Sequence, residues 1–240
     1  MSTKPQLIVA LDNLTVEEVW PVVEDMKAAE VKWLKVGLEL FSKAGPSIVS
    51  KIKSQGFEVF LDLKLYDIPN TVAKAVSAAA DTGASLLTIH CSGGSEMMKA
   101  AVAATNGTQL KLLGVTVLTS FSDTDIAEIG TSWGEKPRAN RSEIALNLAN
   151  TAAHAGVHGI VCSVSDLQSG KLKSFFSKPL FVTPGIRGAD DAANDQKSVA
   201  TINEAVKAGS THLVMGRPIL NPAIGSRTDA ARAALREISA

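Results

Sequence analysis

The segment FLDLKLYDIPNT contains two carboxylates and one ammonium group, Asp62, Lys64 and Asp67. Because side chains alternate between two faces along a strand, Asp62 and Lys64 project from one face, and the intervening leucines pack on the other. Asp67 follows the strand, where the sequence IPNT turns into a helix. A fixed cation flanked by anions can stabilise developing negative charge and donate a proton. The motif therefore predicts chemistry at a strand end.

A structural ion pair is the alternative interpretation of this motif, since most D-x-K pairs in proteins serve only the fold. Here, however, two charges on one face of an apolar strand must lose water together. That costs on the order of several kcal/mol per ion unless the charges pair. Proteins seldom keep such an arrangement without a use, so the catalytic interpretation is favoured.

Short apolar runs alternate along the chain with longer segments of helical period, and these elements must position the motif. Eight apolar runs begin at Leu7, Trp33, Glu58, Leu86, Lys111, Gly159, Leu180 and His212. The helical segments are residues 16–29, 45–55, 71–82, 95–105, 141–155, 166–176, 199–208 and 229–238. Such alternation favours parallel strands joined by crossover helices.

Eight strand–helix units in a chain of about 250 residues are typical of a closed (β/α)₈ TIM barrel, an α/β fold. An open doubly wound sheet is the competing architecture. The first run is followed by DNLT, however, and carries no glycine-rich dinucleotide-binding turn. No linker or low-complexity tract divides the chain. We therefore expect a single barrel domain over residues 1–240.

The ends of the predicted strands carry polar and charged groups, and the active site of a TIM barrel lies at this end. These groups are Asp12, Lys35, Asp62 with Lys64, His90, Thr119 with Ser120, the backbone of Pro184-Gly185 followed by Arg187, and Gly216-Arg217. A barrel stabilised by packing alone would not need this set. Asp12 and His90 also have simpler interpretations, as a helix cap near Thr15 and as a buried core histidine.

A phosphate site is predicted at the ends of the seventh and eighth strands, where barrels often hold this group. Arg187 and Arg217 supply planar donors that suit phosphate oxygens, and Gly185 and Gly216 allow close backbone approach. A solvated arginine in a turn is the alternative for either motif alone. The polar stretch 188–198 that follows Arg187 is either a surface loop or a lid over the ligand.

Charge and composition exclude several classes of partner. The chain has 24 Lys and Arg residues and 24 Asp and Glu residues, so no global field attracts nucleic acid or an anionic membrane. The early apolar run LIVAL is too short for a signal sequence or a membrane span. Cys91 and Cys162 follow apolar runs and are expected to be buried, free thiols. We expect a cytoplasmic protein.

Taken together, LIVALD, LKVGLE, FLDLKLYDIPNT, TVLTS, TPGIR and GRPI resemble the orotidine 5′-phosphate decarboxylase family, in the same order and over nearly the whole chain. The resemblance implies a homodimeric barrel with shared active sites and no metal or cofactor. It implies conversion of orotidine 5′-monophosphate to uridine 5′-monophosphate and CO₂, the last step of de novo uridylate synthesis. Segment 122–140, with Trp133 and Lys136, matches no motif of the family.

The resemblance also implies residue roles. Lys64 would protonate C6 of the pyrimidine, within a charged network that includes Lys35, Asp62 and Asp67. Residues implied to contact the substrate are Asp12 and Lys35 at the ribose, Thr119 and Ser120 at the base, and Pro184, Arg187, Gln196, Gly216 and Arg217 at the phosphate. Residues implied to reach the neighbouring subunit's site are Asp67, Ile68 and Thr71.

The chemistry of that reaction explains the residue types. Loss of CO₂ from C6 leaves an electron pair in the ring plane, orthogonal to the π system, so ordinary carbanion sinks do not help. A cation such as Lys64 can stabilise this pair and then deliver a proton, and adjacent carboxylates favour its charged form. Crowding of the departing carboxylate by Asp62 would be a further contribution, through ground-state destabilisation.

Three rival functions fit parts of the pattern. Metal-dependent sugar-phosphate decarboxylases share the barrel, but they carry an acidic residue where this chain has Lys35. A non-catalytic phosphate-binding barrel would use the same charges only to hold a nucleotide. Schiff-base chemistry at Lys64 requires an uncharged amine, which the adjacent carboxylates disfavour.

Overall fold

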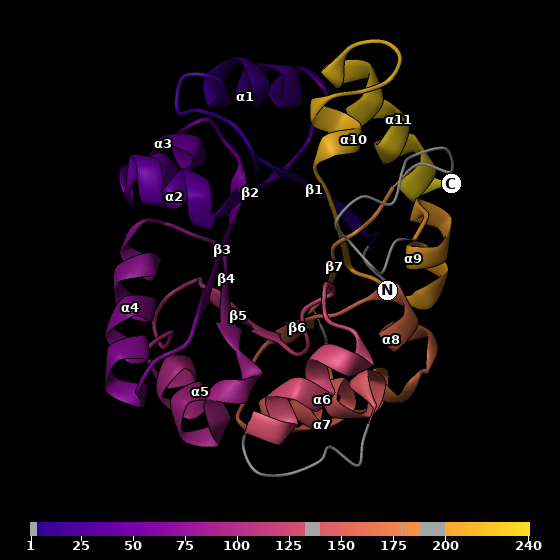
Figure 1. Cartoon of the computed structure of the whole chain (residues 1–240). Coiled ribbons are helices and arrows are strands. Elements are labelled where there is room, and N and C mark those ends of the chain that lie inside the picture. Colours follow the sequence, from indigo (N-terminus) through magenta and orange to yellow (C-terminus); the bar gives the residue numbers. More distant parts are fainter. Residues whose placement is uncertain (1–3, 133–139, 179, 188–199) are drawn as a thin grey trace.

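The computed structural model describes residues 4–132, 140–178, 180–187 and 200–240. Within them, eight parallel strands pair in sequence order and close into a barrel, with β8 returning to β1. The strands are β1 Gln6–Ala10, β2 Trp33–Gly37, β3 Glu58–Leu65, β4 Leu86–His90, β5 Lys111–Val115, β6 Gly159–Val161, β7 Leu180–Thr183 and β8 His212–Met215. The predicted TIM barrel is confirmed, and Figure 1 shows it along its axis, inside a ring of helices.

The helices that follow these strands are α1 Val19–Ala28, α2 Leu38–Ala44, α3 Ser47–Ser54, α4 Pro69–Asp81, α5 Gly94–Ala103, α6 Asp123–Ser132, α7 Arg141–His154, α8 Val164–Gln168, α9 Ile202–Ala208, α10 Arg217–Leu220 and α11 Arg227–Ser239. Two 3₁₀ turns are η1 Cys91–Gly93 and η2 Lys171–Ser174. None of the described helices is both long and apolar enough to cross a bilayer.

Two hydrophobic layers hold these elements together. The smaller layer fills the barrel interior and includes Ile8, Phe60, Leu113 and Val214. The larger layer lies between the outer faces of the strands and the surrounding helices. Because alternate residues of each strand enter different layers, the strands are buried on both sides, as expected for a parallel sheet. Cys91 and Cys162 are buried free thiols, as predicted, and burial raises the pKa of Cys91 to about 12.

Several predicted elements are wrong in their limits. The apolar run WLKVGL, which begins at Trp33, includes Leu38, but β2 ends at Gly37. The helix α2, which was not predicted, starts at Leu38 and is separated from α3 by Gly45, whose φ is +69°. The predicted helix 166–176 is interrupted at Gly170, which adopts a left-handed conformation between α8 and η2. The helix α10 was not predicted, because a four-residue helix is too short to show a period.

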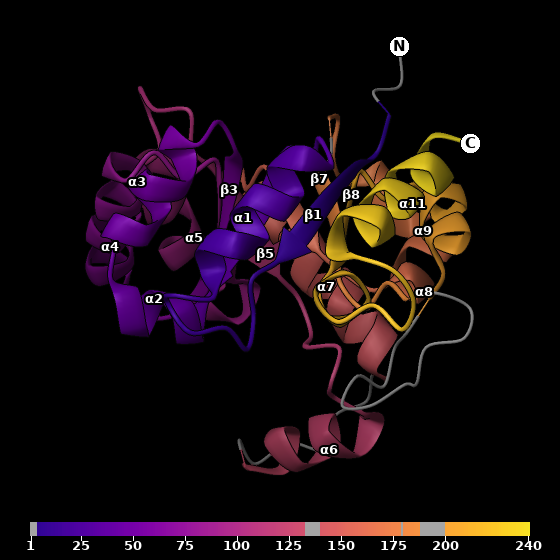
Figure 2. The ribbon, with the colours of Figure 1, turned by 90° about the horizontal axis from the view of Figure 1, so that it is seen from above.

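The helix α6 lies in segment 122–140, for which no element was predicted. Its Ile126 packs against Val117 and Ala145, and its Asp123 carboxylate accepts a hydrogen bond of 2.7 Å from the backbone N–H of Arg141. Figure 2 shows α6 set apart from the ring of helices, beyond one end of the barrel. Trp133 and Lys136 of the same segment lie outside the described residues.

His212 gives the fold an expected dependence on pH. Its buried imidazole packs edge-on against Trp33, with ring centroids 5.1 Å apart, and burial and Lys111 lower its pKa to about 4. The unfolded chain binds a proton at this histidine below its ordinary pKa of about 6.5, and the folded chain does not. The free energy of unfolding should therefore fall by about 3 kcal/mol as pH drops from 6.5 to 4.

Urea unfolding at several pH values between 7.5 and 4.5 checks this expectation against His212→Phe, which keeps an aromatic ring beside Trp33. The variant should show a shallower decline in the free energy of unfolding over this range. Parallel declines in the two proteins would assign the acid sensitivity to other groups.

Candidate active site

A cavity of about 500 Å³ opens at the end of the barrel where the strands finish. Its floor is apolar and is formed by side chains of the barrel interior, including Phe60, Val161 and Val214. Polar side chains from the strand ends and the loops after them surround this floor. Of the predicted site residues, those that line the cavity are Asp12, Lys35, Asp62, Lys64, Thr119, Pro184, Arg187, Gly216 and Arg217.

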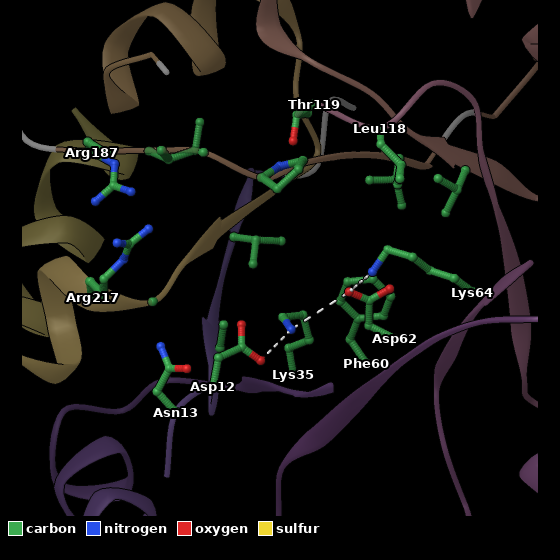
Figure 3. Close-up of a pocket in the computed structure, with 18 of the residues that line it drawn as sticks. Asp12, Asn13, Lys35, Phe60, Asp62, Lys64, Leu118, Thr119, Arg187 and Arg217 are labelled. Carbon is green, nitrogen blue, oxygen red and sulfur yellow. Dashed lines mark hydrogen bonds and ion pairs between the residues drawn. The ribbon is translucent and has the colours of Figure 1, made fainter. Parts of the chain in front are cut away.

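Four side chains of alternating charge form a connected set, here called the charged series, along one side of the cavity (Figure 3). Lys35 Nζ lies 2.8 Å from Asp12 Oδ1 and 3.7 Å from Asp62 Oδ2. Lys64 Nζ lies 2.8 Å from the same Asp62 Oδ2. The sign of the charge alternates along the series Asp12, Lys35, Asp62, Lys64, so the four side chains together are neutral. Such pairing offsets the cost of burying the charges.

Asp62 joins the two lysines of the charged series. Its side chain is only 14% exposed, and burial opposes its charge, but Lys35 and Lys64 outweigh burial and hold the pKa of the carboxyl below its usual range. The carboxylate therefore stays ionised at neutral pH. It presents a fixed negative charge beside the ammonium of Lys64.

Lys64 adopts a left-handed backbone conformation, with φ of +50°. The pairing of β3 with β4 shifts register between Leu61 and Leu65, so Lys64 lies in a bulge. A residue with a side chain pays about 1–3 kcal/mol for such a conformation, and bulges near active sites often re-aim a side chain. A regular strand was expected here, and sequence alternation gave no sign of the bulge.

Thr88 was missed by the sequence analysis. It lies on β4, has no exposed surface, and bonds to both Asp62 and Lys64. Its hydroxyl accepts the backbone N–H of Lys64 at 2.8 Å and donates to Asp62 Oδ1 at 2.9 Å. The signal was present in LLTIH, where Thr88 is the polar residue inside an otherwise apolar run.

Gly37, at the end of β2, lies against the ion pair of Asp12 and Lys35. A Cβ atom at this position would lie 2.7 Å from Asp12 Oδ1 and 3.1 Å from Lys35 Nζ. Any larger residue would push the carboxylate of Asp12 away from Lys35. The helix-cap interpretation of Asp12 is wrong, because Asp12 bonds to Lys35 and the turn before α1 is closed by Thr15 and Glu18.

Arg187 and Arg217 lie at the opposite end of the cavity from Lys64, with their guanidinium groups directed inward (Figure 3). Arg187 is 7% exposed, and its Nε finds no hydrogen-bond partner within the residues described. A buried donor without a partner is costly, so this end of the cavity suits an anion. Gly185, before Arg187, has φ of +78°, which favours glycine.

Other predicted residues lie elsewhere. Ser120 is exposed and does not line the cavity, although its neighbour Thr119 does. His90 stands at the end of β4 against Tyr66, with ring centroids 5.9 Å apart, and burial and Lys64 lower its pKa. Gln196 falls outside the described residues, together with the loop 188–198.

Within one subunit, the carboxylate of Asp67 does not lie beside Lys64. The motif had predicted carboxylates on both sides of this lysine. The side chain of Asp67 is exposed and accepts the backbone N–H of Ile68 at 2.7 Å. The segment around it is also exposed, with Tyr66 at 60% and Ile68 at 67%. The sequence places Asp67 near Lys64 along the chain, but the turn after β3 directs it outward.

No group of three or more His, Cys, Asp or Glu side chains that could hold a metal ion occurs among the described residues. The carboxylates of Asp12 and Asp62 do approach each other, but the ammonium of Lys35 lies between them. The positive charge of Lys35 at this position disfavours a divalent cation there.

Comparison with known proteins assigns this arrangement to a family. A family model described as orotidine 5′-phosphate decarboxylase / HUMPS family matches residues 5–234. The orotidine 5′-phosphate decarboxylase of Idiomarina loihiensis is 46% identical over 221 residues, which cover 91% of this chain and 92% of that protein. The enzyme of the same name from Saccharophagus degradans is 44% identical over 218 residues, covering 90% and 88%.

Solved structures agree in fold. The orotidine 5′-phosphate decarboxylase of Lactobacillus acidophilus superposes with a TM-score of 0.83 at 34% identity, covering 99% of this chain and all of that one. The orotidine 5′-monophosphate decarboxylase of Methanocaldococcus jannaschii, solved in complex with the inhibitor BMP, gives a TM-score of 0.75 at 23% identity and covers 99% and 100%. At that identity the second likeness concerns the fold alone.

Proposed function

Because the chain belongs to the orotidine 5′-phosphate decarboxylase / HUMPS family, we propose that it converts orotidine 5′-monophosphate to uridine 5′-monophosphate and CO₂ in pyrimidine synthesis. The observation that carries the proposal is the cavity with two different ends. One end offers two guanidinium groups to a phosphate, and the other offers the Asp62–Lys64 pair to a reacting ring. The proposal includes one domain over residues 1–240, no cofactor and a cytoplasmic location.

Binding of the substrate would use the cavity in three parts. Arg187, Arg217 and the backbone at Pro184 and Gly216 would hold the phosphate, and Gln196 is a further candidate there. Asp12 and Lys35 would bond the ribose hydroxyls. The apolar floor would receive the pyrimidine ring, with Thr119 at its edge and Ser120 reaching it only by a change in the loop after β5. This orientation brings C6 of the ring toward Lys64.

The chemical step would then proceed at Lys64. The bond between C6 and the carboxylate carbon breaks, CO₂ leaves, and the electron pair stays on C6 in the plane of the ring. The ammonium of Lys64, held in place by Asp62, stabilises this pair and transfers a proton to C6. Preorganised charges over an apolar floor are effective because little water screens them. Remote binding of the phosphate would orient the ring for this step.

The test of this function is the change in ultraviolet absorbance after orotidine 5′-monophosphate is added in the presence of EDTA. We expect turnover that EDTA does not reduce. Turnover that is abolished by EDTA and restored by magnesium would favour a metal-dependent decarboxylase. Tight binding of uridine 5′-monophosphate without turnover would favour a binding protein, and a substrate adduct trapped by borohydride would favour a Schiff base.

A homodimer with shared active sites is a further part of the proposal. It is supported by the outward position of Asp67, Ile68 and Thr71, which the motif associates with the site but which the chain exposes. In a symmetric dimer this surface of one subunit could complete the cavity of the other, so that Asp67 approaches Lys64 across the interface.

Mixing two inactive variants tests whether the sites are shared. Lys64→Ala and Asp67→Asn, refolded together in equal amounts, should regain about a quarter of the parent activity, because half of the dimers are mixed and each has one intact site. Each variant refolded alone is the control. Mixed samples no more active than the average of the two controls would mean that each site is built from one chain.

A further inference from the structure

The hydroxyl of Thr88 connects the backbone of Lys64 with the carboxylate of Asp62. It accepts the N–H of Lys64 at 2.8 Å and donates its own proton to Asp62 Oδ1 at 2.9 Å. A threonine hydroxyl has one proton and two lone pairs, so these two bonds use its donor and one acceptor site in a defined direction. Thr88 is fully buried, so water does not replace either bond from outside.

The bond to Lys64 meets a need created by the bulge. Leu61 pairs with Leu87, and Leu65 pairs with Ile89. Residues 62–64 of β3 therefore lie opposite a single residue of β4, Thr88. Backbone groups inside a bulge lose their regular ladder partners. The side chain of Thr88 supplies a partner for the N–H of Lys64 and holds this residue at its φ of +50°.

The bond to Asp62 determines which oxygen faces the lysines. Oδ1 is bound by Thr88, while Oδ2 lies 2.8 Å from Lys64 Nζ and 3.7 Å from Lys35 Nζ. Without the bond from Thr88, the carboxylate could rotate and share its two oxygens differently between the ammonium groups. One hydroxyl thus sets both the backbone that carries the ammonium and the orientation of its counter-ion.

We infer that Thr88 is a positioning residue for proton transfer by Lys64, an inference that rests on the proposed decarboxylation. Thr88 does not line the cavity, so it acts through Lys64 and Asp62 and not on the substrate. Its loss should affect the chemical step more than nucleotide binding, because the arginines that hold the phosphate lie at the other end of the cavity (Figure 3).

Thr88→Val, which keeps the shape of the side chain and removes the hydroxyl, provides the test. We expect kcat to fall about 100-fold, as for a small displacement of a catalytic group, with KM and the Kd for uridine 5′-monophosphate changed by less than about threefold. Thr88→Ser keeps the hydroxyl and should retain kcat within about threefold of the parent. If the valine variant does not fold, Thr88→Ala makes the same comparison.

Thr116→Val is the matched control, since Thr116 is also buried and its hydroxyl donates a hydrogen bond of 3.4 Å to the carbonyl of Val161. Neither residue belongs to the charged series. The control variant should lose stability without this loss of kcat. Equal kcat losses in Thr88→Val and Thr116→Val, or in Thr88→Val and Thr88→Ser, would overturn the inference. So would an unchanged kcat in Thr88→Val.

A crystal structure of Thr88→Val separates this inference from the proposed function. We expect Lys64 to leave the left-handed region or to lose its bond with Asp62. Coordinates in which both are retained would overturn the inference whatever the activity. Absence of turnover in the parent chain would instead reject the proposed function, and the crystal structure would still decide the role of Thr88.

Discussion

Lys64→Ala is expected to lower kcat for orotidine 5′-monophosphate by about 10⁴-fold or more, while the Kd for uridine 5′-monophosphate stays within about tenfold of the parent. A general acid contributes about 10²–10⁴-fold, and a preorganised charge beside the reacting atom contributes about 10²–10³-fold. Lys64 would supply both. The product needs neither contribution, because it carries no developing charge at C6.

The control for this variant is Lys74→Ala, which removes the same charge from an exposed position on α4. It should retain the activity and the product affinity of the parent. Steady-state kinetics and calorimetric titration with uridine 5′-monophosphate measure the two quantities. Equal losses of turnover and product affinity in Lys64→Ala would show that the lysine binds the nucleotide and does not act in the chemical step.

Replacing Arg187 with alanine is expected to weaken binding of uridine 5′-monophosphate by about 10–100-fold, with a similar effect for Arg217→Ala. A hydrogen bond to a charged group is worth about 1.5–3 kcal/mol. Arg187 is buried, and no described residue accepts a hydrogen bond from its Nε. Binding of uridine, which has no phosphate, should change little. The comparison of nucleotide with nucleoside isolates the contact to phosphate.

Arg236→Ala, on the exposed surface of α11, is the matched control and should leave both affinities unchanged. KM for orotidine 5′-monophosphate should rise in Arg187→Ala, and kcat should fall less than in Lys64→Ala. If uridine and its monophosphate lose affinity equally in Arg187→Ala, the arginine supports the whole cavity and does not select phosphate.

Simple periodicity was sufficient to predict most of the fold. Apolar runs and helical segments located every strand of the described barrel, and the rule that barrel sites lie at strand ends brought Asp12, Lys35, Asp62 and Lys64 together. The same rule placed Arg187 and Arg217 in one cavity. These residues could be found because they lie at or just after strand ends, which the period of the elements locates.

Other features depend on contacts between strands or between chains, which one sequence does not contain. The bulge at Lys64 and its bond to Thr88 follow from the register of β3 against β4. The outward direction of Asp67 follows from the turn before α4. The helix α6 has a single buried apolar residue, Ile126, so its sequence shows little helical pattern.

The absence of a side chain at Gly37 has a consequence for mutational tolerance. In a library that samples all amino acids at each position, substitutions at Gly37 should be depleted, because any Cβ collides with the Asp12 carboxylate and separates it from Lys35. Position 37 would then be scored as functional although it has no reactive group. Engineering that enlarges the cavity beside Asp12 should leave this position untouched and vary Asn13 or Glu39.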